Sequence, residues 1–351
     1  SLGLKVWETD LGEFIVQLGG EMPSHILAPA VHLSREQISK LFADKLGQTS
    51  ESPEELTHMA REVLREQFLN ADVCITGANQ VVAETGTVVL FENEGNIRMG
   101  TTCARTHIAV MSLEKVAETW EDAAAVMQML PRSATGQGLS TYVSAITGAR
   151  REGERDGARD FHLVILDNGR SRLMADPVLR EALCCVRCGS CLNVCPVYQT
   201  VGGFTYGWVY SGPIGQLLTP LIGPEGRGDD LPFACTLCGA CAETCPVGID
   251  HPKLFLELRR QLSEGERDRA PAVERLALGA HTALALHPGL YRAAVGTMRA
   301  LNPGLGLAER CIPAIARFAR RRCLPRLRRP FRARYKGPGS GSSNAQGGGH
   351  E

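Results

Sequence analysis

Two cysteine motifs with identical spacing are the strongest constraint on how this 351-residue chain folds. Each reads C-x2-C-x2-C-x3-C and is followed directly by proline. The first motif contains Cys185, Cys188, Cys191 and Cys195. The second contains Cys235, Cys238, Cys241 and Cys245. This spacing is typical of thiolates that hold [4Fe–4S] clusters, so we expect a chain that carries electrons.

The spacing also predicts how the ligands are shared between two clusters. Three thiolates separated by two residues reach three irons of one cubane, whereas the fourth, displaced by one residue and turned by proline, ligates the other cluster. Cluster one is therefore assigned Cys185, Cys188, Cys191 and Cys245. Cluster two is assigned Cys235, Cys238, Cys241 and Cys195. Two [4Fe–4S] clusters are the predicted cofactors.

Zinc and disulfides fit these cysteines less well. Structural zinc sites use pairs of ligands rather than three evenly spaced cysteines and a fourth before proline. Cysteines this regular do not suit loop stapling either, and thiols of this kind indicate a reducing, cytoplasmic compartment. The remaining cysteines receive no ligand role: Cys74, Cys103, Cys184, Cys311 and Cys323. Cys184 is expected to pack beside a cluster, and Cys74 and Cys103 to behave as small buried hydrophobes.

Charge is balanced over the whole chain but not along it. Lys and Arg together equal Asp and Glu at 38 each, yet every charged side chain from Arg310 to Lys336 is basic. Such a segment favours an anionic partner or the inner face of a membrane, and we do not expect nucleic acid as the partner. No run of eighteen apolar residues occurs, so no membrane-spanning helix is expected. The chain opens without Met, and we expect further sequence upstream.

The first half alternates short apolar segments with amphipathic ones, which predicts an α/β domain. The expected strands are Phe14–Leu18, Val73–Thr76, Val88–Phe91, His107–Met111 and His162–Leu166. The expected helices are 34–46, 52–69 and 114–129. Ser34 with Gln37 caps the first, Pro53 lies in the first turn of the second, and Pro131 stops the third. The loop 134–138, which contains Thr135-Gly-Gln-Gly, is expected to precede and cap a helix over 139–146.

Several longer motifs resemble a known family. They include Ala71-Asp-Val-Cys-Ile-Thr-Gly-Ala-Asn, Ala83-Glu-Thr-Gly-Thr, Asn93-Glu-Gly-Asn and Thr106-His-Ile-Ala-Val-Met. These stretches look like the lactate-utilisation (LUD) domain. Their order, followed by both cysteine motifs, resembles the lactate utilization protein B family, the iron–sulfur subunits of bacterial L-lactate oxidation complexes. The resemblance covers roughly residues 4 to 260.

The resemblance implies a fold, a role and partners. It implies an α/β LUD domain similar to ribose-phosphate isomerases and CoA transferases, here amino-terminally incomplete, followed by an α-helical ferredoxin domain with two [4Fe–4S] clusters. The expected divisions are 1–175 for the LUD-like domain, 176–262 for the ferredoxin domain, 263–336 for a helical basic region and 337–351 for a flexible tail. It implies an electron-transfer subunit for L-lactate oxidation to pyruvate, not catalytic alone. The implied partners are a cysteine-rich CCG-type subunit and a second LUD protein.

Three alternatives remain open at this point. The chain could serve another dehydrogenase or a disulfide reductase, or its α/β domain could bind a CoA-like or folate-like ligand as an enzyme. The clusters could also have a purely structural or regulatory role. Glu84, before a close-approach glycine, resembles the position of the nucleophilic carboxylate in CoA transferases, although Val89 stands where a second glycine belongs. Together with Asn79, Thr85 and Asn93 it forms a candidate ligand site at predicted strand ends. The residues 198–221 are expected to cover the clusters.

Overall fold

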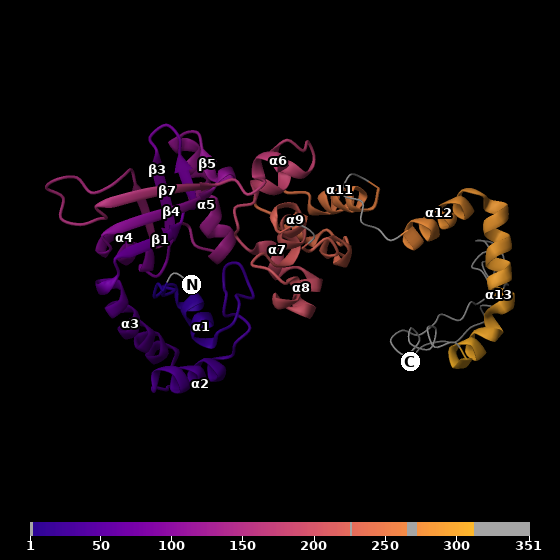
Figure 1. The fold of residues 1–351 in the computed structure, drawn as a ribbon, viewed down its shortest axis with the longest axis horizontal. Helices are drawn as coiled ribbons and strands as arrows, with labels where there is room; N and C mark the ends of the chain where they lie inside the picture. Colours follow the sequence, from indigo (N-terminus) through magenta and orange to yellow (C-terminus); the bar gives the residue numbers. More distant parts are fainter. Residues whose placement is uncertain (1–2, 225–226, 265–271, 312–351) are drawn as a thin grey trace, which may run out of the picture. The chain divides into compact units, whose positions relative to one another are not determined.

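The computed structural model describes residues 3–224, 227–264 and 272–311, without the side chains of 273–274 and 301–311. The chain divides into two units, Ser1–Asp268 and Arg269–Glu351. The first unit holds both sheets and all eight motif cysteines (Figure 1). Most of the basic segment that begins at Arg310, and the tail 337–351, lie outside the described residues.

Three helices open the first unit: α1 (Leu11–Gly19), α2 (Arg35–Leu46) and α3 (Pro53–Asn70). The two capping predictions are confirmed, since Ser34 and Gln37 form a capping box and Ser52 caps α3 ahead of Pro53. The predicted strand at Phe14–Leu18 is wrong, because this segment lies within α1. Asp10 caps the start of that helix and Gly20, at φ 68°, ends it. A short apolar run does not distinguish a buried helix from a strand, and here the caps decide.

The core of these three helices is aromatic at its centre. Phe14 and Phe42 are fully buried, with ring centroids 6.3 Å apart in an edge-to-face arrangement. Leu56 and Leu64 from α3 close the same cluster. Burying side chains of this size supplies about 1.5–3 kcal/mol each, so the three helices hold together through this face rather than through helix propensity.

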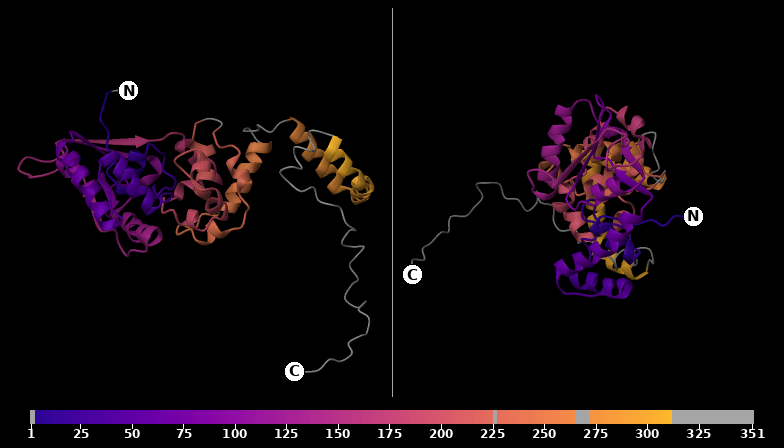
Figure 2. Two further views of the ribbon diagram at one scale, coloured as in Figure 1. Left: turned by 90° about the horizontal axis from the view of Figure 1, so that it is seen from below. Right: turned by 90° about the vertical axis from the view of Figure 1, so that its left-hand side faces the viewer.

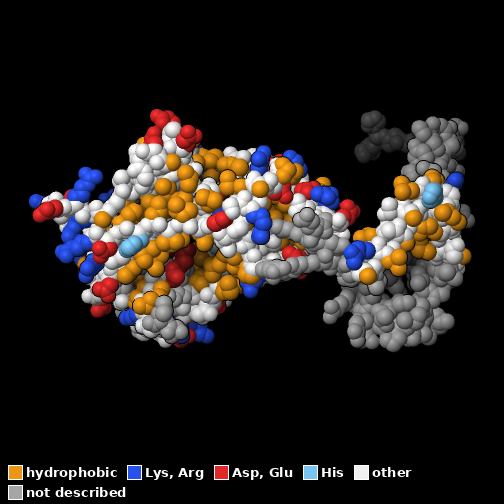
Figure 3. Space-filling view, turned by 45° about the horizontal axis from the view of Figure 1, so that its top comes forward, with side chains coloured by type: hydrophobic (Ala, Val, Ile, Leu, Met, Phe, Trp, Pro, Cys, Tyr) orange, Lys and Arg blue, Asp and Glu red, His pale blue; other side chains and the backbone are white. Residues whose placement is uncertain are grey.

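A three-stranded parallel sheet forms the centre of the α/β half. Its order is β1 (Val73–Gly77), β4 (Thr106–Ser112), β7 (Asp160–Leu166), with Ile75 opposite Ile108 and Ile108 opposite His162. The strands predicted at these three places are confirmed. One face leaves Val73, Ile75, Val164 and Leu166 exposed, at 43–68% of their surface. Hydrophobic side chains gather on this half of the unit in Figure 3. Parallel sheets are normally covered on both faces, and this face has no covering layer within the described residues.

A second, four-stranded sheet has the order β5-β2-β3-β6. β3 (Thr87–Glu92), which confirms the strand predicted at 88–91, pairs antiparallel with β2 (Gln80–Val82) and with β6 (Tyr142–Ile146). β5 (Val116–Ala117) runs parallel to β2. α4 (Asn96–Cys103) precedes β4, and its Gly100 leaves room for Cys74, since a Cβ there would lie 2.6 Å from the sulfur. The predicted helix over 139–146 is wrong, because most of it forms β6.

The predicted helix over 114–129 is also wrong at both ends. Glu114 and Lys115 belong to a 3-10 turn, η1 (Leu113–Lys115), and β5 follows before the helix begins. α5 (Trp120–Thr135) starts after a capping box formed by Thr119 and Asp122. It continues past Pro131 and ends at Gly136, which takes φ 77°, so the expected loop is the carboxyl-terminal cap of α5. A proline costs a helix one donor, and later backbone bonds can carry the helix past it.

After β7 the chain becomes helical and wraps around the cysteine motifs. The elements are α6 (Arg170–Met174), η2 (Leu179–Cys184), α7 (Ser190–Asn193), α8 (Pro196–Val201), η3 (Phe204–Tyr206), α9 (Gly212–Ile222), η4 (Leu231–Ala234), α10 (Ala240–Glu243) and α11 (His251–Glu264). α9 is buried at nearly every position, with Ile214, Leu217 and Leu218 at 0% exposure. It is therefore the central helix of this half, and Figure 1 shows α7 and α11 beside it.

The second unit contains α12 (Ala272–Leu286) and α13 (Pro288–Cys311) (Figure 2). Leu276, Leu286 and Leu290 expose 58–76% of their surface. None of the helices in the described part of the chain is both long and apolar enough to cross a bilayer.

Candidate metal centre

The two cysteine motifs fold into the same backbone shape. Each begins after a 3-10 turn, then places a residue at positive φ between its first two cysteines: Arg187 at 65° and Leu237 at 56°. A glycine at positive φ follows the second cysteine in both, Gly189 at 76° and Gly239 at 85°, and starts a one-turn helix. Residues other than glycine seldom adopt this conformation, so the repeat indicates a loop shaped for a bound group.

Backbone amides within these loops point at the cysteine sulfurs. The N–H of Arg187 donates to Sγ of Cys185 at 3.4 Å, and that of Leu237 donates to Sγ of Cys235 at 3.3 Å. The N–H of Tyr198 reaches Sγ of Cys195 at 3.5 Å. Hydrogen bonds of this kind stabilise negative charge on sulfur, which is the usual way in which a protein raises the reduction potential of an iron–sulfur cluster.

One small cavity brings cysteines of both motifs together. Cys185, Cys188 and Cys191 line it from the first motif, and Cys245 lines it from the second. Ile26 from the α/β half, Ile214 from α9 and His251 from α11 complete its wall. These four cysteines are the set assigned to cluster one on spacing alone, so the donors present fit a cubane shared between the motifs.

The remaining four motif cysteines lie close enough together to affect one another's pKa values. Burial raises the pKa of the Cys241 thiol to about 12, and the neighbouring Cys235, Cys195 and Cys238 raise it further. The pKa of Cys235 is also raised, first by burial and in part by Cys195 and Cys238. Cys195 belongs to the first motif, and its proximity to the second motif matches the set assigned to cluster two. Because buried thiols resist ionisation, positive iron is the partner that would hold them as thiolates.

The arrangement does not suit a single metal ion. Among the described residues, no three His, Cys, Asp or Glu side chains converge closely enough to hold one ion. A tetrahedral zinc site would draw its sulfurs to about 2.3 Å from a common centre. A cubane places its ligands farther apart, one on each iron, which fits cysteines that surround a cavity.

Aromatic residues of the 198–221 segment pack against the core that holds the cysteines. Tyr198, Trp208 and Tyr210 contact a buried cluster that includes Cys191 and Cys241. Tyr206 is buried, and this burial raises the pKa of its hydroxyl. The nearby thiols of Cys195 and Cys235 raise that pKa further. This segment therefore packs against the core that holds Cys191 and Cys241, whereas Cys238 stays exposed.

A buried charge network joins the α/β half to cluster one. Glu114, 3% exposed, pairs with Arg170 at 2.7 Å and with Arg187 at 3.1 Å. Lys115 donates from Nζ to the carbonyl oxygen of Cys185 at 2.7 Å. Arg187 also lies over the ring of Tyr210, 4.9 Å from its centroid. No sequence pattern predicts this network. The one local signal is an arginine inside a cysteine motif, because its partner Glu114 lies 73 residues away.

The candidate ligand residues Glu84, Asn79, Thr85 and Asn93 are engaged in local hydrogen bonds. Glu84 is exposed and accepts from the backbone N–H of Trp120 at 3.0 Å, so it caps α5. Asn79 accepts from Phe91, Asn93 accepts from Thr141, and Thr85 bonds Thr87. Only Asn79 of the four lines one of the cavities described below. A shared ligand site for them stays a prediction.

The cysteines without a ligand role lie in different surroundings. Cys184 and Cys103 are exposed, so neither is the buried packing residue that the sequence suggested. Cys74 is partly buried, and burial raises its pKa to about 11, as expected of a thiol held among apolar groups. The side chains of Cys311 and Cys323 lie outside the description.

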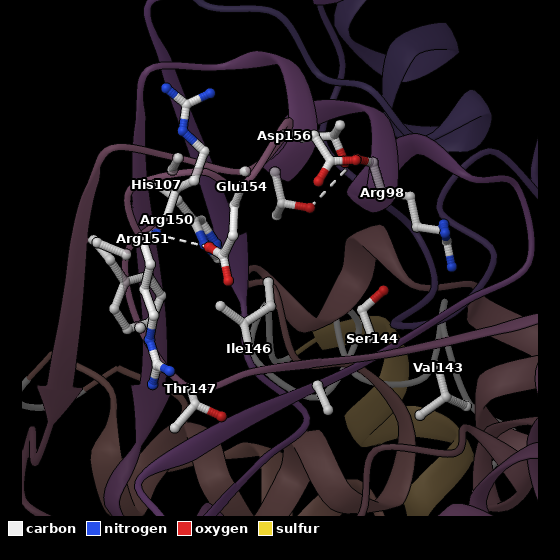
Figure 4. Close-up of a pocket in the computed structure, with 18 residues that line it drawn as sticks. Arg98, His107, Val143, Ser144, Ile146, Thr147, Arg150, Arg151, Glu154 and Asp156 are labelled. Carbon is white, nitrogen blue, oxygen red and sulfur yellow. Dashed lines mark hydrogen bonds between the residues drawn. The ribbon is translucent and has the colours of Figure 1, made fainter.

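One cavity of the α/β half, about 600 Å³, lies at the amino-terminal ends of β4 and β7. Figure 4 shows Arg98, Arg150 and Arg151 around it, together with Glu154 and Asp156. His107 lies in its wall, 1% exposed, and is hydrogen-bonded to Thr76 at 2.8 Å. Ligands of open α/β sheets usually bind at the opposite, carboxyl-terminal ends of the strands, so this cavity does not lie where a ligand is expected.

A second cavity, about 320 Å³, lies at the carboxyl-terminal ends of β1 and β4. Ala78 and Asn79 follow β1 there, and Glu114 and Lys115 follow β4. Cys184, Val186 and Arg187 close it from the side of the cysteine motifs. The sheet edge that usually carries ligands in α/β folds thus faces cluster one.

These features define an iron–sulfur protein with an α/β domain in front of a helical two-cluster region. Comparison with known families agrees: residues 1–166 match the LUD domain, and residues 181–249 match the 4Fe-4S dicluster domain. The chain belongs to the lactate utilization protein B family and holds two [4Fe–4S] clusters.

Several relatives carry this resemblance. Lactate utilization protein B of Shouchella clausii is 49% identical over 83% of this chain and 61% of its own length. The protein of the same name from Macrococcus caseolyticus is 48% identical over the same shares. The uncharacterized electron transport protein YkgF of Escherichia coli is 45% identical over 84% of this chain and 62% of its own length. The chain therefore spans about three fifths of the relatives that it matches.

Proposed function

We propose that this chain is an electron-transfer subunit that acts in the oxidation of L-lactate to pyruvate. The observation that carries the proposal is the cavity lined by Cys185, Cys188, Cys191 and Cys245, in which two motifs supply one cluster site. The choice of lactate as the substrate rests on the names of the relatives. Each bound cluster supplies a one-electron carrier. The protein's own part is to hold the thiolates, donate amides to them and exclude water.

The wall around the clusters suits a relay rather than a site of chemistry. Cys191 and Cys241 belong to a buried cluster of hydrophobic residues, and Nδ1 of the neighbouring His251 bonds the carbonyl of Ile249 at 3.0 Å. Lactate oxidation removes two electrons and two protons, whereas a cubane takes one electron at a time. We therefore expect the first step on lactate to occur on a partner subunit, for which the proposed candidates are a cysteine-rich CCG-type protein and a second LUD protein.

The experiment is anaerobic iron and sulfide analysis of the reconstituted chain, coupled to EPR after dithionite and again after lactate with the candidate partner subunits. About eight irons per chain, with cubane signals that lactate and partners also produce, would support the relay. Intact clusters that lactate never reduces under any partner combination would remove the lactate role. If the chain instead transfers electrons for another dehydrogenase or a disulfide reductase, the substrate of that enzyme should reduce the clusters.

An enzyme that uses Glu84 is another alternative, and the structure favours it less. Its carboxylate caps α5 and does not line the described cavities. Glu84→Gln should leave lactate-dependent cluster reduction and iron content unchanged. Lost turnover with intact clusters would instead support a CoA-transferase-like activity.

We further infer that the α/β half follows the ribose-phosphate isomerase and CoA-transferase type of fold, which the parallel β1-β4-β7 sheet supports. The division into 1–175, 176–262 and a basic carboxyl-terminal region also stays a proposal. We place the protein in the cytoplasm, with the basic segment Arg310–Lys336 as a contact for anionic lipid on the inner face of the membrane.

A further inference from the structure

The cavity between the α/β half and cluster one has unused hydrogen-bond donors on two cations. The Lys115 ammonium group has three N–H donors, and one of them bonds the carbonyl oxygen of Cys185. Arg187 uses Nη2 for Glu114, while its Nη1 is buried without a partner. Both side chains line the cavity. Donors on buried cations are costly to leave unpaired, so this space is suited to an acceptor.

The acidic groups around the cavity are already neutralised. Glu114 pairs with Arg170 at 2.7 Å as well as with Arg187, so one carboxylate faces two guanidinium groups. Asp122 accepts from the backbone N–H of Thr119 at 3.2 Å and from its hydroxyl at 2.9 Å, as part of the helix cap. Two cations, Lys115 and Arg187, line the cavity with two carboxylates that are both engaged. Arg170 does not line the cavity, but its pairing with Glu114 adds a third positive charge, so the balance favours an anion.

The remaining wall gives the cavity a polar and an apolar side. Gln80 is 7% exposed, and its Oε1 has no partner although the residue lines the space. Asn79 lies beside it. The apolar side consists of Val116, Ala117, Val126, Leu130, Leu183 and Val186. About 320 Å³ is at the lower end of the range for small-molecule sites.

We propose that this cavity binds a small carboxylate, with the carboxylate group on Lys115 and Arg187 and the carbon atoms against the apolar wall. Guanidinium groups match carboxylate geometry with paired hydrogen bonds, and the unpartnered Oε1 of Gln80 is placed to accept a hydrogen bond from a hydroxyl group. The site lies at the strand ends that usually hold ligands and against the loop of cluster one. The idea rests on the proposed function only for the choice of lactate and pyruvate as probes.

The competing explanation is that both cations merely balance the negative charge of the cluster. Lys115 bonds the carbonyl of Cys185 rather than its sulfur, and the Arg187 guanidinium pairs with Glu114 and lies over Tyr210. The sulfur of Cys185 accepts from the backbone N–H of Arg187 and also lies near its guanidinium, so charge balance explains part of the Arg187 placement. Charge balance alone does not explain the unpartnered Oε1 of Gln80. A cavity with a polar and an apolar side is what a ligand requires.

The test is calorimetric titration of the full chain with both clusters reconstituted, using sodium pyruvate, sodium L-lactate and sodium phosphate under anaerobic conditions. Iron content and the dithionite-reduced EPR spectrum are recorded on the same samples. We expect saturable one-to-one binding of pyruvate or L-lactate, weaker binding of phosphate, and a ligand-induced change in the EPR signal that is lost with cluster one. Equal binding of phosphate would overturn the carboxylate assignment.

Variants separate the site from the cluster. Gln80→Glu keeps the side-chain shape, adds a competing carboxylate and should abolish saturable binding with iron content unchanged. Lys115→Met should weaken binding at least about tenfold, which corresponds to 1.4 kcal/mol. Lys45→Met, in the last turn of α2, is the matched control and should bind as the parent does. Absence of saturable binding in a parent chain with both clusters intact would overturn this inference and leave the electron relay untouched.

Discussion

Lys115 bonds the carbonyl oxygen of Cys185 at 2.7 Å, which ties the end of β4 and its following turn to the first ligand of cluster one. In the predicted ligand set, Cys185 holds the cluster through its sulfur, and its backbone carbonyl contacts the α/β half. The ion pair between Glu114 and Arg187 is a second link between the same two parts. A ligand at the strand ends and an electron on the cluster would each act on the same loop.

Exchange of the fourth ligand between the motifs gives the first prediction. Cys245→Ser should remove the cluster whose other ligands lie in the first motif, although Cys245 itself belongs to the second. Cys195→Ser should remove the other cluster. Each variant should keep about half of the iron, and EPR of the reduced proteins should show two different surviving signals.

Cys184→Ser is the matched control, since Cys184 is exposed and adjacent to a ligand without lining the cluster cavity. It should retain all the iron. If Cys245→Ser and a first-motif variant such as Cys188→Ser left different signals behind, the shared-ligand assignment would be wrong.

Removal of the charge on Glu114 should destabilise the first unit strongly. Glu114 and Arg170 are each 3% exposed, and Glu114→Gln would leave two buried guanidinium groups without a carboxylate. A broken buried pair costs about 3–5 kcal/mol. Anaerobic urea unfolding of the holoprotein, followed by circular dichroism, measures this loss.

The surface pair of Arg105 and Asp160 provides the comparison, at 74% and 48% exposure. Asp160→Asn makes the same change from carboxylate to amide and should cost less than about 1 kcal/mol. Equal losses for the two variants would show that burial does not set the strength of the Glu114 network.

Gly203 sits where no side chain fits. A Cβ there would lie 1.6 Å from the carbonyl oxygen of Ser24, which already accepts the hydroxyl of Tyr198 at 2.9 Å. Gly203→Ala should therefore displace the loop at Ser24 from the cluster region and destabilise it by roughly 1–3 kcal/mol. Its apparent Tm, followed by loss of the visible absorption of the clusters, should fall. Gly148→Ala meets nothing within 4 Å and should unfold as the parent does.

Glu13 predicts a pH dependence of stability. Burial, followed by its contact with Asp10, raises the pKa of Glu13 from 4.5 to about 8. Between these values the unfolded chain releases the proton while the folded chain keeps it. The contribution of Glu13 to stability is thus complete below about pH 4.5 and declines as the pH rises towards 8.

Glu13→Gln imitates the protonated side chain at every pH, so its advantage in apparent Tm over the parent should grow between pH 5 and pH 8. Glu51→Gln, at an exposed position, should show no such trend. A constant difference between Glu13→Gln and the parent across this range would contradict the raised pKa.

Sequence patterns predicted those features that depend on interactions between residues close together in the chain. The cysteine spacing predicts which thiols can reach one cubane, and the cavity lined by Cys245 together with three cysteines of the first motif supports that prediction. Ser34 with Gln37 predicts a helix start because both hydrogen bonds span three residues. The segments that failed were ambiguous over short distances. Phe14–Leu18 reads equally well as a buried helix or strand, and Tyr142–Ile146 becomes a strand by pairing with β3.

The sequence by itself determined the cofactor and the family, because four thiols at fixed spacing allow few other metals and long ordered motifs seldom recur by chance. The tertiary structure alone decided what surrounds the clusters. Glu114, Arg170 and Arg187 come from separate segments, and no periodicity brings them together. Their meeting follows from the parallel strand order β1-β4-β7, which places the loops after β4 and β7 at one sheet edge. Burial at that edge then makes each charge depend on its partner, which no local pattern in the chain records.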